Sequence, residues 1–248
     1  MAIEAGTSTY YQAKRGIVQD GLVLHLDAGV KESYSGGDKI YDLKNLDRNG
    51  VITPTSSIVK GRKNVGIKYH GTSGLGAFYM YTSAYNFAMN NQTYLFYMKC
   101  EQASAGYGSF DNWIIQLGGY YANNSFGLGL QGPSFMIYAK GSTTSGWSYG
   151  SVSTSGGTIY SNNLGEWIFY VIKFSEGGTG FKVYMNNTLV FNVPTSISDA
   201  FTGINSSGRH VFGRLMKSTF GSLMVYNTIL DDNQIAQIYN STRHRFGL

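Results

Sequence analysis

The sequence contains few cysteines, prolines and charged residues. Cys100 is the only cysteine among 248 residues, which excludes an internal disulfide bond and a cysteine-based zinc site. With only three prolines, the chain has no proline-rich linker between domains. Charged residues make up 13% of the chain, and its net charge of +5 is dispersed. Because there is no basic stripe, nucleic acid is not expected as a partner.

A segment that directs proteins into or across membranes is not expected in this sequence. The residues after Met1 form neither a basic region nor an apolar core, so no secretory signal peptide is expected. No apolar run is long enough to span a bilayer, and membrane insertion is therefore not expected.

Glycine and aromatic residues are abundant instead. The chain holds 33 Gly, 20 Tyr and 14 Phe. Aromatic side chains suit the pleated, half-buried surface of a β-sheet, and glycine suits the turns between short strands. Hydrophobic residues make up 42% of the chain, which is enough for a sizeable core.

Alternating apolar residues recur along the chain and predict about a dozen strands. Leucines at alternate positions of residues 22–27 predict a strand with one face toward the core. Residues 135–139 and 167–174 are apolar on both faces, as expected of strands that are covered on both sides. The pair Asn186-Asn187 predicts a tight hairpin turn, because asparagine tolerates positive φ.

One short helix is predicted near the C-terminus. Asp231 is placed to cap its start, and Gln234 stands three positions later, as a capping box requires. Ile235, Ile238 and Tyr239 share one helical face, so the helix is expected to pack against a sheet or close one end of the sandwich.

Three segments are expected along the chain. Residues 1–20 are polar and lack sustained periodicity, which predicts an N-terminal arm. Strand patterns and turn signals fill residues 21–240, which predicts a single β-sandwich. Residues 241–248 contain two arginines and a histidine and are interpreted as a basic C-terminal tail.

Several segments, in their order along the chain, carry a family resemblance. They are residues 20–29, 33–36, 41–50, 165–167, 181–187 and 221–230, the last with Ile235 and Tyr239 of the predicted helix. Together they resemble the laminin-G-like, concanavalin A-like jelly-roll family over residues 16–248. The resemblance implies an all-β jelly-roll sandwich with one short C-terminal helix. The sequence departs from the family in having Lys44-Asn45-Leu46-Asp47 where a Ser-Gly-Asn-Gly turn is common, and Asn-Asn rather than Asn-Gly at the hairpin.

The terminal segments 6–15 and 243–248 are similar to those of tailed-phage virion proteins, so the resemblance is more specific to the members of the family found in phage particles. This implies a structural or decoration protein on the virion exterior, associated with capsid or tail. Its expected partners are other virion proteins, with a homo-oligomer as one arrangement. Such a protein is made in the host cytoplasm and needs no signal peptide, because lysis releases the particles. The residues predicted to dock on the virion are Tyr10, Tyr11, Lys14, Arg15, Arg243 and Arg245.

An adhesin that binds carbohydrate on the host surface is the alternative function. Sugar binding needs an aromatic platform beside amide groups in loops at one rim of the sandwich. The residues with this composition are Tyr120, Tyr121, Trp147 and Tyr149. The competing interpretation is burial of these rings in the core or a subunit contact, since 15% of the chain is aromatic.

Catalysis and metal binding have weaker sequence support. No glutamate has a second acidic residue two or four positions away, so the carboxylate pair of a polysaccharide hydrolase is not found, and no enzyme activity or cofactor is expected. Calcium is the one metal considered, with Asp27, Asp42 and Asp47 as candidate ligands. The competing interpretation, which we favour, is that Asp27 and Asp42 cap turns through the neighbouring backbone.

Overall fold

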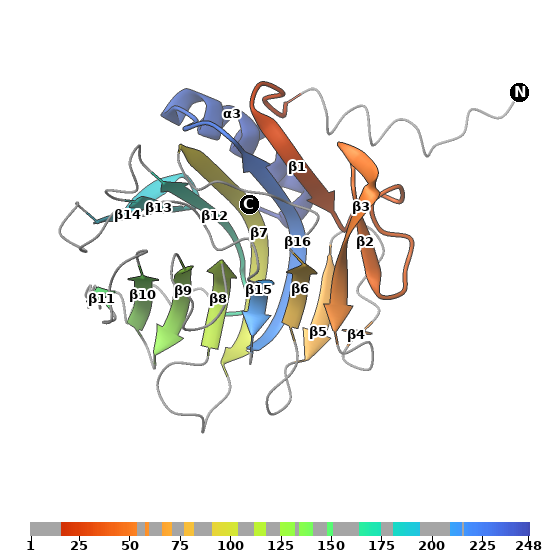
Figure 1. The fold of residues 1–248 in the computed structure, drawn as a ribbon, viewed down its shortest axis with the longest axis horizontal. Coiled ribbons are helices and arrows are strands. Elements are labelled where there is room, and N and C mark those ends of the chain that lie inside the picture. Colours follow the sequence, from red (N-terminus) through yellow and green to blue (C-terminus); the bar gives the residue numbers. More distant parts are fainter. Residues whose placement is uncertain are drawn as a thin grey trace, which may run out of the picture.

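The computed structural model is a sandwich of two antiparallel β-sheets with a helical segment at the C-terminus (Figure 1). This confirms the predicted jelly-roll class. The described residues are 16–53, 58–59, 66–70, 77–81, 91–103, 112–117, 125–131, 134–140, 148–150, 164–174, 181–193, 209–214 and 216–248. Among them no helix is long and apolar enough to cross a bilayer.

Each sheet has eight strands. Sheet 1 runs in the order β14 (Thr188–Val193), β13 (Phe181–Met185), β12 (Trp167–Phe174), β7 (Gln92–Ala103), β16 (Met216–Tyr226), β5 (Ile67–His70) and β4 (Ile58–Val59), and β1 (Leu22–Asp27) also pairs with β16. Sheet 2 runs in the order β11 (Ser148–Gly150), β10 (Ser134–Lys140), β9 (Ser125–Gln131), β8 (Asn112–Leu117), β15 (Arg209–Arg214), β6 (Ala77–Tyr81), β3 (Asn45–Thr53) and β2 (Lys39–Asp42).

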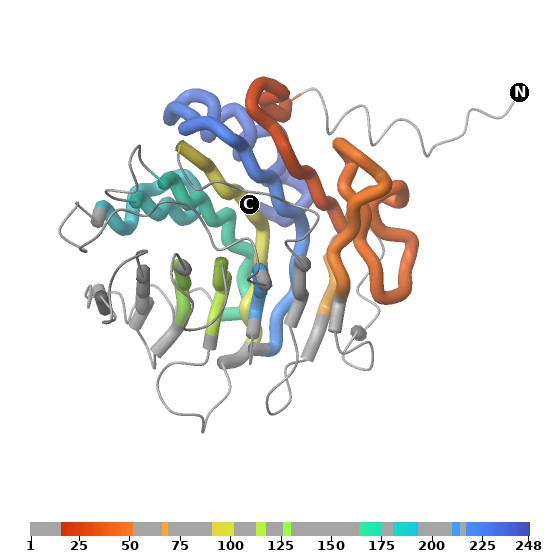
Figure 2. Tube along the Cα trace, in the orientation of Figure 1, coloured from red at the N-terminus to blue at the C-terminus, as the bar shows by residue number. Residues whose placement is uncertain are grey.

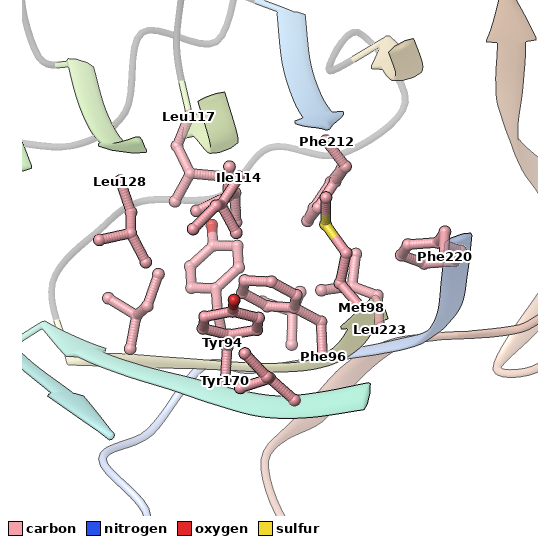
Figure 3. Close-up of a cluster of buried hydrophobic side chains, with 14 of the residues drawn as sticks. Tyr94, Phe96, Met98, Ile114, Leu117, Leu128, Tyr170, Phe212, Phe220 and Leu223 are labelled. Atoms are coloured by element: carbon pink, nitrogen blue, oxygen red, sulfur yellow. The ribbon is translucent and has the colours of Figure 1, made fainter. Parts of the chain in front are cut away.

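The main apolar core lies between the two sheets (Figure 3). Alternate residues of β7, among them Tyr94, Phe96 and Met98, are fully buried in it, as their spacing predicts. Phe96 stacks on Tyr170 of β12 with ring centroids 4.9 Å apart, and meets Phe212 of β15 edge-on at 5.7 Å. Such aromatic pairs stabilise beyond the area they bury, so β7, β12 and β15 hold the two sheets together.

A second apolar cluster covers the outer face of sheet 1. It joins Phe169 and Val171 of β12 to Ile235 and Ile238 of α3 (Asp232–Thr242), which continues into the 3-10 helix η4 (Arg243–Phe246). Strand β12 is thus covered on both faces, as predicted for residues 167–174. The helical segment therefore occupies one outer surface of the sandwich.

Local sequence signals explain the helix start and the hairpin turn. Asp231 accepts a hydrogen bond from the backbone N–H of Gln234, and the Gln234 side chain accepts one from the backbone N–H of Asp231. Both halves of the predicted capping box are therefore present. Asn186 and Asn187 have φ values of 47° and 64°, which is the conformation expected for a tight turn between β13 and β14.

The first strand corrects one prediction. Leu24 and Leu26 lie in the core between the sheets, but Leu22 belongs to the second cluster, beside the helix. The pairing of β1 with β16 shifts register between Leu22 and Leu24, so the alternation is interrupted at that point. The leucine spacing alone could not reveal this irregularity.

Both ends of the sandwich domain also differ from prediction. Ile17, placed in the predicted arm, is buried in the second cluster, and the Tyr226 hydroxyl donates to the Val18 carbonyl at 2.8 Å. Residues 241–248, predicted as a tail, form the last turn of α3 and η4, with Phe246 buried. The described start of the chain and its C-terminal segment lie side by side (Figures 1 and 2). Apolar residues within both segments make them part of the sandwich.

Candidate functional site

Of the four residues predicted to contact a glycan, Tyr149 alone lies within the described part of the chain. Tyr120, Tyr121 and Trp147 fall outside it. Tyr149 is the central residue of β11, which is an edge strand of sheet 2, and it is paired with Tyr138 of β10. The backbone register therefore pairs two tyrosine positions at this edge.

Strands β8 to β11 all reach the same end of sheet 2 (Figure 1). Strand β8 ends at Leu117 and β9 begins at Ser125. Ser125 is paired with Lys140, the last residue of β10, and the neighbouring Ala139 is paired with Ser148, the first residue of β11. We call this end, marked by Leu117, Ser125, Lys140 and Ser148, the 117–125 rim.

The connections that contain the predicted glycan residues Tyr120, Tyr121 and Trp147 begin and end at strand ends of the 117–125 rim. Tyr120 and Tyr121 belong to the connection between β8 and β9, and Trp147 directly precedes β11. Antiparallel pairing brings the ends of these strands to one side of the sheet. The β8–β9 connection, which contains Tyr120 and Tyr121, and the β10–β11 connection, which contains Trp147, therefore start from the same side of sheet 2. A sugar site at one rim needs its aromatic residues on the same side of the sheet.

One row of directly paired residues crosses all eight strands of sheet 2. Phe126 and Leu128, the neighbours of Gly127 in β9, lie in the core. Because successive residues of a strand alternate between faces, Gly127 and its row belong to the outer face of the sheet. In strand order, the row is Lys39, Val51, Tyr79, Val211, Gln116, Gly127, Tyr138 and Tyr149.

The composition of this row changes along the sheet. Val211 and Gln116, in the middle, are buried at 5% and 1% exposure. Toward the edge strand β11, the row continues through Gly127 to Tyr138 and Tyr149. Glycine has no side chain to occupy the face, and tyrosine offers a rigid apolar ring with a polar end. The end of the row nearest β11 thus has the residue types that suit a sugar ring.

The candidate calcium ligand Asp27 is held by an arginine. Arg245 donates to both carboxylate oxygens at 2.6 Å, and the backbone N–H of Gly29 donates to Oδ1 at 2.9 Å. The Asp27 side chain is 2% exposed and that of Arg245 is 19% exposed. The bidentate geometry is the strong form of an arginine–carboxylate pair, so in this structure Arg245 occupies the positions that a cation would take.

The Asp42 carboxylate is also used by the backbone. Its Oδ1 accepts hydrogen bonds of 2.9 Å from the N–H groups of His25 and Lys44, which ties β1 to the start of the β2–β3 hairpin. Burial raises the pKa of Asp42, although both backbone donors oppose the shift. Asp27 and Asp42 thus each accept from an N–H two positions ahead, in the turn-capping arrangement that the sequence favoured.

The third candidate ligand, Asp47, lies apart from this arrangement. It is exposed on β3, where its backbone N–H donates to the Asn45 side chain at 3.1 Å. Within the described part of the chain, no group of three or more His, Cys, Asp or Glu side chains is placed to hold a metal ion. Calcium binding stays a prediction that no described cluster supports.

The residues predicted to dock on a virion fall into two groups. Tyr10, Tyr11, Lys14 and Arg15 lie outside the described residues. At the other end, Arg243 is exposed above the Tyr239 ring, with its guanidinium carbon 5.5 Å from the ring centroid, whereas Arg245 is committed to Asp27. Of the two C-terminal arginines, only Arg243 is exposed for an outside partner.

Phe246, which the sequence did not single out, anchors the C-terminus. Its ring stacks on Tyr97 with centroids 3.9 Å apart and lies 4.8 Å from Trp167. A Cβ atom added at Gly221 would come within 2.5 Å of the Phe246 ring, so only glycine leaves room for it. The segment that binds Asp27 is therefore held by packing as well as charge.

His210 lies inside the core rather than in an accessible site. It lies on β15, 1% exposed, with its ring centroid 6.5 Å from that of Tyr94 in the core. Burial lowers the pKa of His210 to about 3, so the imidazole is neutral near pH 7. A neutral histidine inside the core is a structural residue.

Comparisons with known proteins support the fold. No protein-family model and no curated protein matches the sequence. Among solved structures, Trypanosoma rangeli sialidase has a TM-score of 0.63 at 12% identity, with 98% of this chain and 39% of that chain covered. The botulinum neurotoxin D ligand-binding domain, solved with N-acetylneuraminic acid, has a TM-score of 0.62 at 13% identity, with 93% of this chain and 53% of that chain covered.

The binding domain of Paraclostridial Mosquitocidal Protein 1 is similar to the same degree. Its TM-score is 0.60 at 15% identity, with 89% of this chain and 52% of that chain covered. This chain therefore spans about two fifths of the sialidase and about half of each toxin domain. Identities this low show a shared β-sandwich fold.

Proposed function

We propose that this chain is a non-enzymatic glycan-binding domain carried on the exterior of a tailed-phage virion, with the sugar bound at the 117–125 rim. The observation that carries the proposal is the register of sheet 2. It brings the connections with Tyr120, Tyr121 and Trp147 to neighbouring strand ends, next to Tyr149. A pyranose stacks on an apolar platform of aromatic rings, which is why these residue types support the proposal.

The position of the helical segment supports this choice of surface. The outer face of sheet 1 is covered by α3 and η4, which pack on it through the second apolar cluster. Sheet 2 carries the row that ends at Tyr138 and Tyr149. The binding surface is therefore assigned to sheet 2. The surface formed by α3 and η4 is assigned a role in stabilising the fold.

The similar structures also favour carbohydrate. One is a sialidase, which was also solved with sialic acid, and another is a toxin domain solved with N-acetylneuraminic acid. The non-enzymatic part of the proposal rests on the acidic residues. Asp27 and Asp42, the buried carboxylates of the described part, are held by Arg245 and by backbone donors respectively. Neither is arranged as the pair of carboxyl groups that glycoside hydrolysis uses.

The virion setting rests on the sequence resemblance of the terminal and internal segments. Because Arg245 and Phe246 are used inside the sandwich, we assign attachment to residues 1–15 rather than to the C-terminus. A decoration protein without sugar binding is the second candidate, favoured by the same resemblance. Glycan binding separates the two candidates.

A glycan array probed with the purified chain tests the proposal. We expect selective binding that Trp147→Ala and Tyr149→Ala each weaken about tenfold, because a nucleic-acid base stacked on an aromatic side chain contributes roughly 1–3 kcal/mol and a pyranose is expected to use the same apolar face. Tyr41→Ala is the matched control, since Tyr41 lies on β2, the opposite edge strand of the same sheet. Absence of any signal at high protein concentration would contradict glycan binding, and the decoration role would be the only candidate function left.

A further inference from the structure

A row of mostly polar residues crosses the outer face of sheet 1 beyond the helical cover. Direct backbone pairing joins one residue from each of β5, β16, β7 and β12 in turn: Lys68, Thr219, Lys99 and Trp167. The next row along the same strands is buried throughout in the main core: Ile67, Phe220, Met98 and Ile168. Because successive residues of a strand alternate between faces, the row from Lys68 to Trp167 belongs to the outer face.

Trp167 marks the border between this row and the helical cover. It packs against the second apolar cluster, and its ring centroid lies 4.8 Å from that of Phe246 in η4. A Cβ atom added at Gly66 or Gly221 would come within 2.9 Å or 3.1 Å of the benzene part of the indole. The Trp167 ring is therefore held in place on three sides, and part of it remains exposed.

Three partly exposed lysines surround Thr219 on this face. Lys68 and Lys99 flank it on the neighbouring strands, and Lys217 stands two residues before it on β16. The intervening Ser218 is fully buried, so alternation along β16 puts Lys217 on the same face as Thr219. The lysines therefore form one cationic surface that borders Trp167.

Only part of this positive charge is balanced. Glu101 of β7 pairs with Lys68, with its two carboxylate oxygens 2.8 Å and 2.6 Å from the ammonium nitrogen. Within the described part of the chain, the ammonium groups of Lys99 and Lys217 take part in no hydrogen bond or ion pair. We call the set the lysine patch, and it consists of Lys68, Lys99, Glu101, Trp167, Lys217 and Thr219. Three lysines and one glutamate leave it with two unbalanced positive charges.

We infer that the lysine patch binds an acidic, extended segment of a neighbouring protein, with carboxylates paired to Lys99 and Lys217 and an apolar group against Trp167. Charge complementarity selects the acidic segment, and a tryptophan held by its neighbours is a common energetic centre of protein interfaces. The row spans three strand spacings, about 14 Å, so its ligand covers several residues rather than a single anion. The patch lies on sheet 1 and the 117–125 rim on sheet 2, so this contact does not depend on sugar binding.

Fluorescence anisotropy of labelled peptides with the full chain tests the inference. The probes are hexaglutamate and hexaglutamine, whose six extended residues span about 20 Å and so exceed the length of the row. We expect hexaglutamate to bind about tenfold more tightly at low salt, because two exposed lysine–carboxylate pairs each contribute up to roughly fivefold. The preference should decrease as salt is added, because the charges are exposed to solvent.

Charge-reversal variants assign the preference to the patch. The double variant Lys99→Glu with Lys217→Glu should remove the preference for hexaglutamate, whereas Trp167→Phe should weaken the binding of both peptides. Lys39→Glu is the matched control, because Lys39 is an exposed lysine on β2, an edge strand of sheet 2. Thermal unfolding of each variant verifies that it is folded.

The results distinguish this inference from the proposed function. Equal binding of the two peptides, or a preference that survives the double charge reversal in a folded protein, would overturn the inference. Dextran sulfate that binds the patch while hexaglutamate does not would overturn a protein segment as the partner and indicate an anionic glycan. Loss of the peptide preference in the double variant, with its glycan-array signal unchanged, would support the patch as a separate site.

Discussion

Arg245 donates hydrogen bonds of 2.6 Å to both carboxylate oxygens of Asp27, which lies 218 positions earlier in the chain. The pair connects η4 to the end of β1. Removing Arg245 would leave the Asp27 charge buried without its bidentate partner, and losing one partner of a buried pair is strongly destabilising. We predict that Arg245→Ala lowers the free energy of unfolding by about 3 kcal/mol, as measured by urea denaturation.

A double-mutant cycle with Asp27→Asn isolates the interaction between the two side chains. The double variant should be more stable than the sum of the single effects by at least about 1 kcal/mol, because no charge is then left unpaired. Arg243→Ala, an exposed neighbour, is the control and should cost less than about 1 kcal/mol. Additive single effects would show that the contact contributes nothing.

Packing of the C-terminus gives a second prediction. Phe246 is buried between Tyr97 and Trp167 and lies over Gly221. Phe246→Ala should lower the free energy of unfolding by about 3 kcal/mol, the usual cost of truncating a buried phenylalanine. Phe246→Leu, which keeps most of the apolar volume, should cost less. If both substitutions had the same negligible effect in urea denaturation, the terminus would not be anchored in solution.

The buried histidine predicts a pH dependence of stability. The pKa of His210 is about 3 in the folded chain because of burial, against about 6.5 when unfolded, so the unfolded state binds the extra proton between these values. Stability contributed by neutral His210 is therefore present above about pH 6.5 and lost as pH falls, at about 1.4 kcal/mol per pH unit.

Urea denaturation of the wild type and His210→Gln between pH 7 and pH 4 checks this dependence. The difference between their stabilities should shrink as pH falls, because only the wild type carries the imidazole. Asp42, with its pKa raised by burial, acts in the opposite direction but equally in both proteins. A difference that is constant with pH would mean that His210 takes up its proton equally in the folded and unfolded states, and would contradict the lowered pKa of His210 in the folded chain.

The boundary of the N-terminal arm gives a fourth prediction. Removing residues 1–15 should leave the melting temperature unchanged, whereas removing residues 1–20 should cost about 2 kcal/mol, because Ile17 and its contacts with the second cluster are lost. Under the proposed virion setting, the shorter deletion should still abolish incorporation into particles. Normal incorporation of the 16–248 chain would remove the role assigned to the arm.

Much of the fold was predictable because its signals are local. The alternation in β7, the capping box at Asp231 and the asparagine turn depend on residues a few positions apart. The errors arose where distant residues meet. The register shift at Leu22, the ion pair between Asp27 and Arg245, and the site for Phe246 over Gly221 are fixed by tertiary contacts that spacing does not encode.

The residue types of the candidate site were predictable from the sequence, but the spatial arrangement of the segments that contain them was not. Tyr149 and the aromatic connections were singled out for their residue types, but the sequence gives no pairing register. The structure adds the partners Ser125–Lys140 and Ala139–Ser148, which bring these connections to one rim.

Chemical-shift mapping of the isotopically labelled chain with a glycan that it binds tests the central claim most directly. We predict that the amide signals that move belong to the 117–125 rim, including Ser125, Lys140 and Ser148, with those of α3 unchanged. Shifts confined to α3 or to the β2–β3 hairpin, or no shifts with any glycan, would contradict a sugar site at this rim.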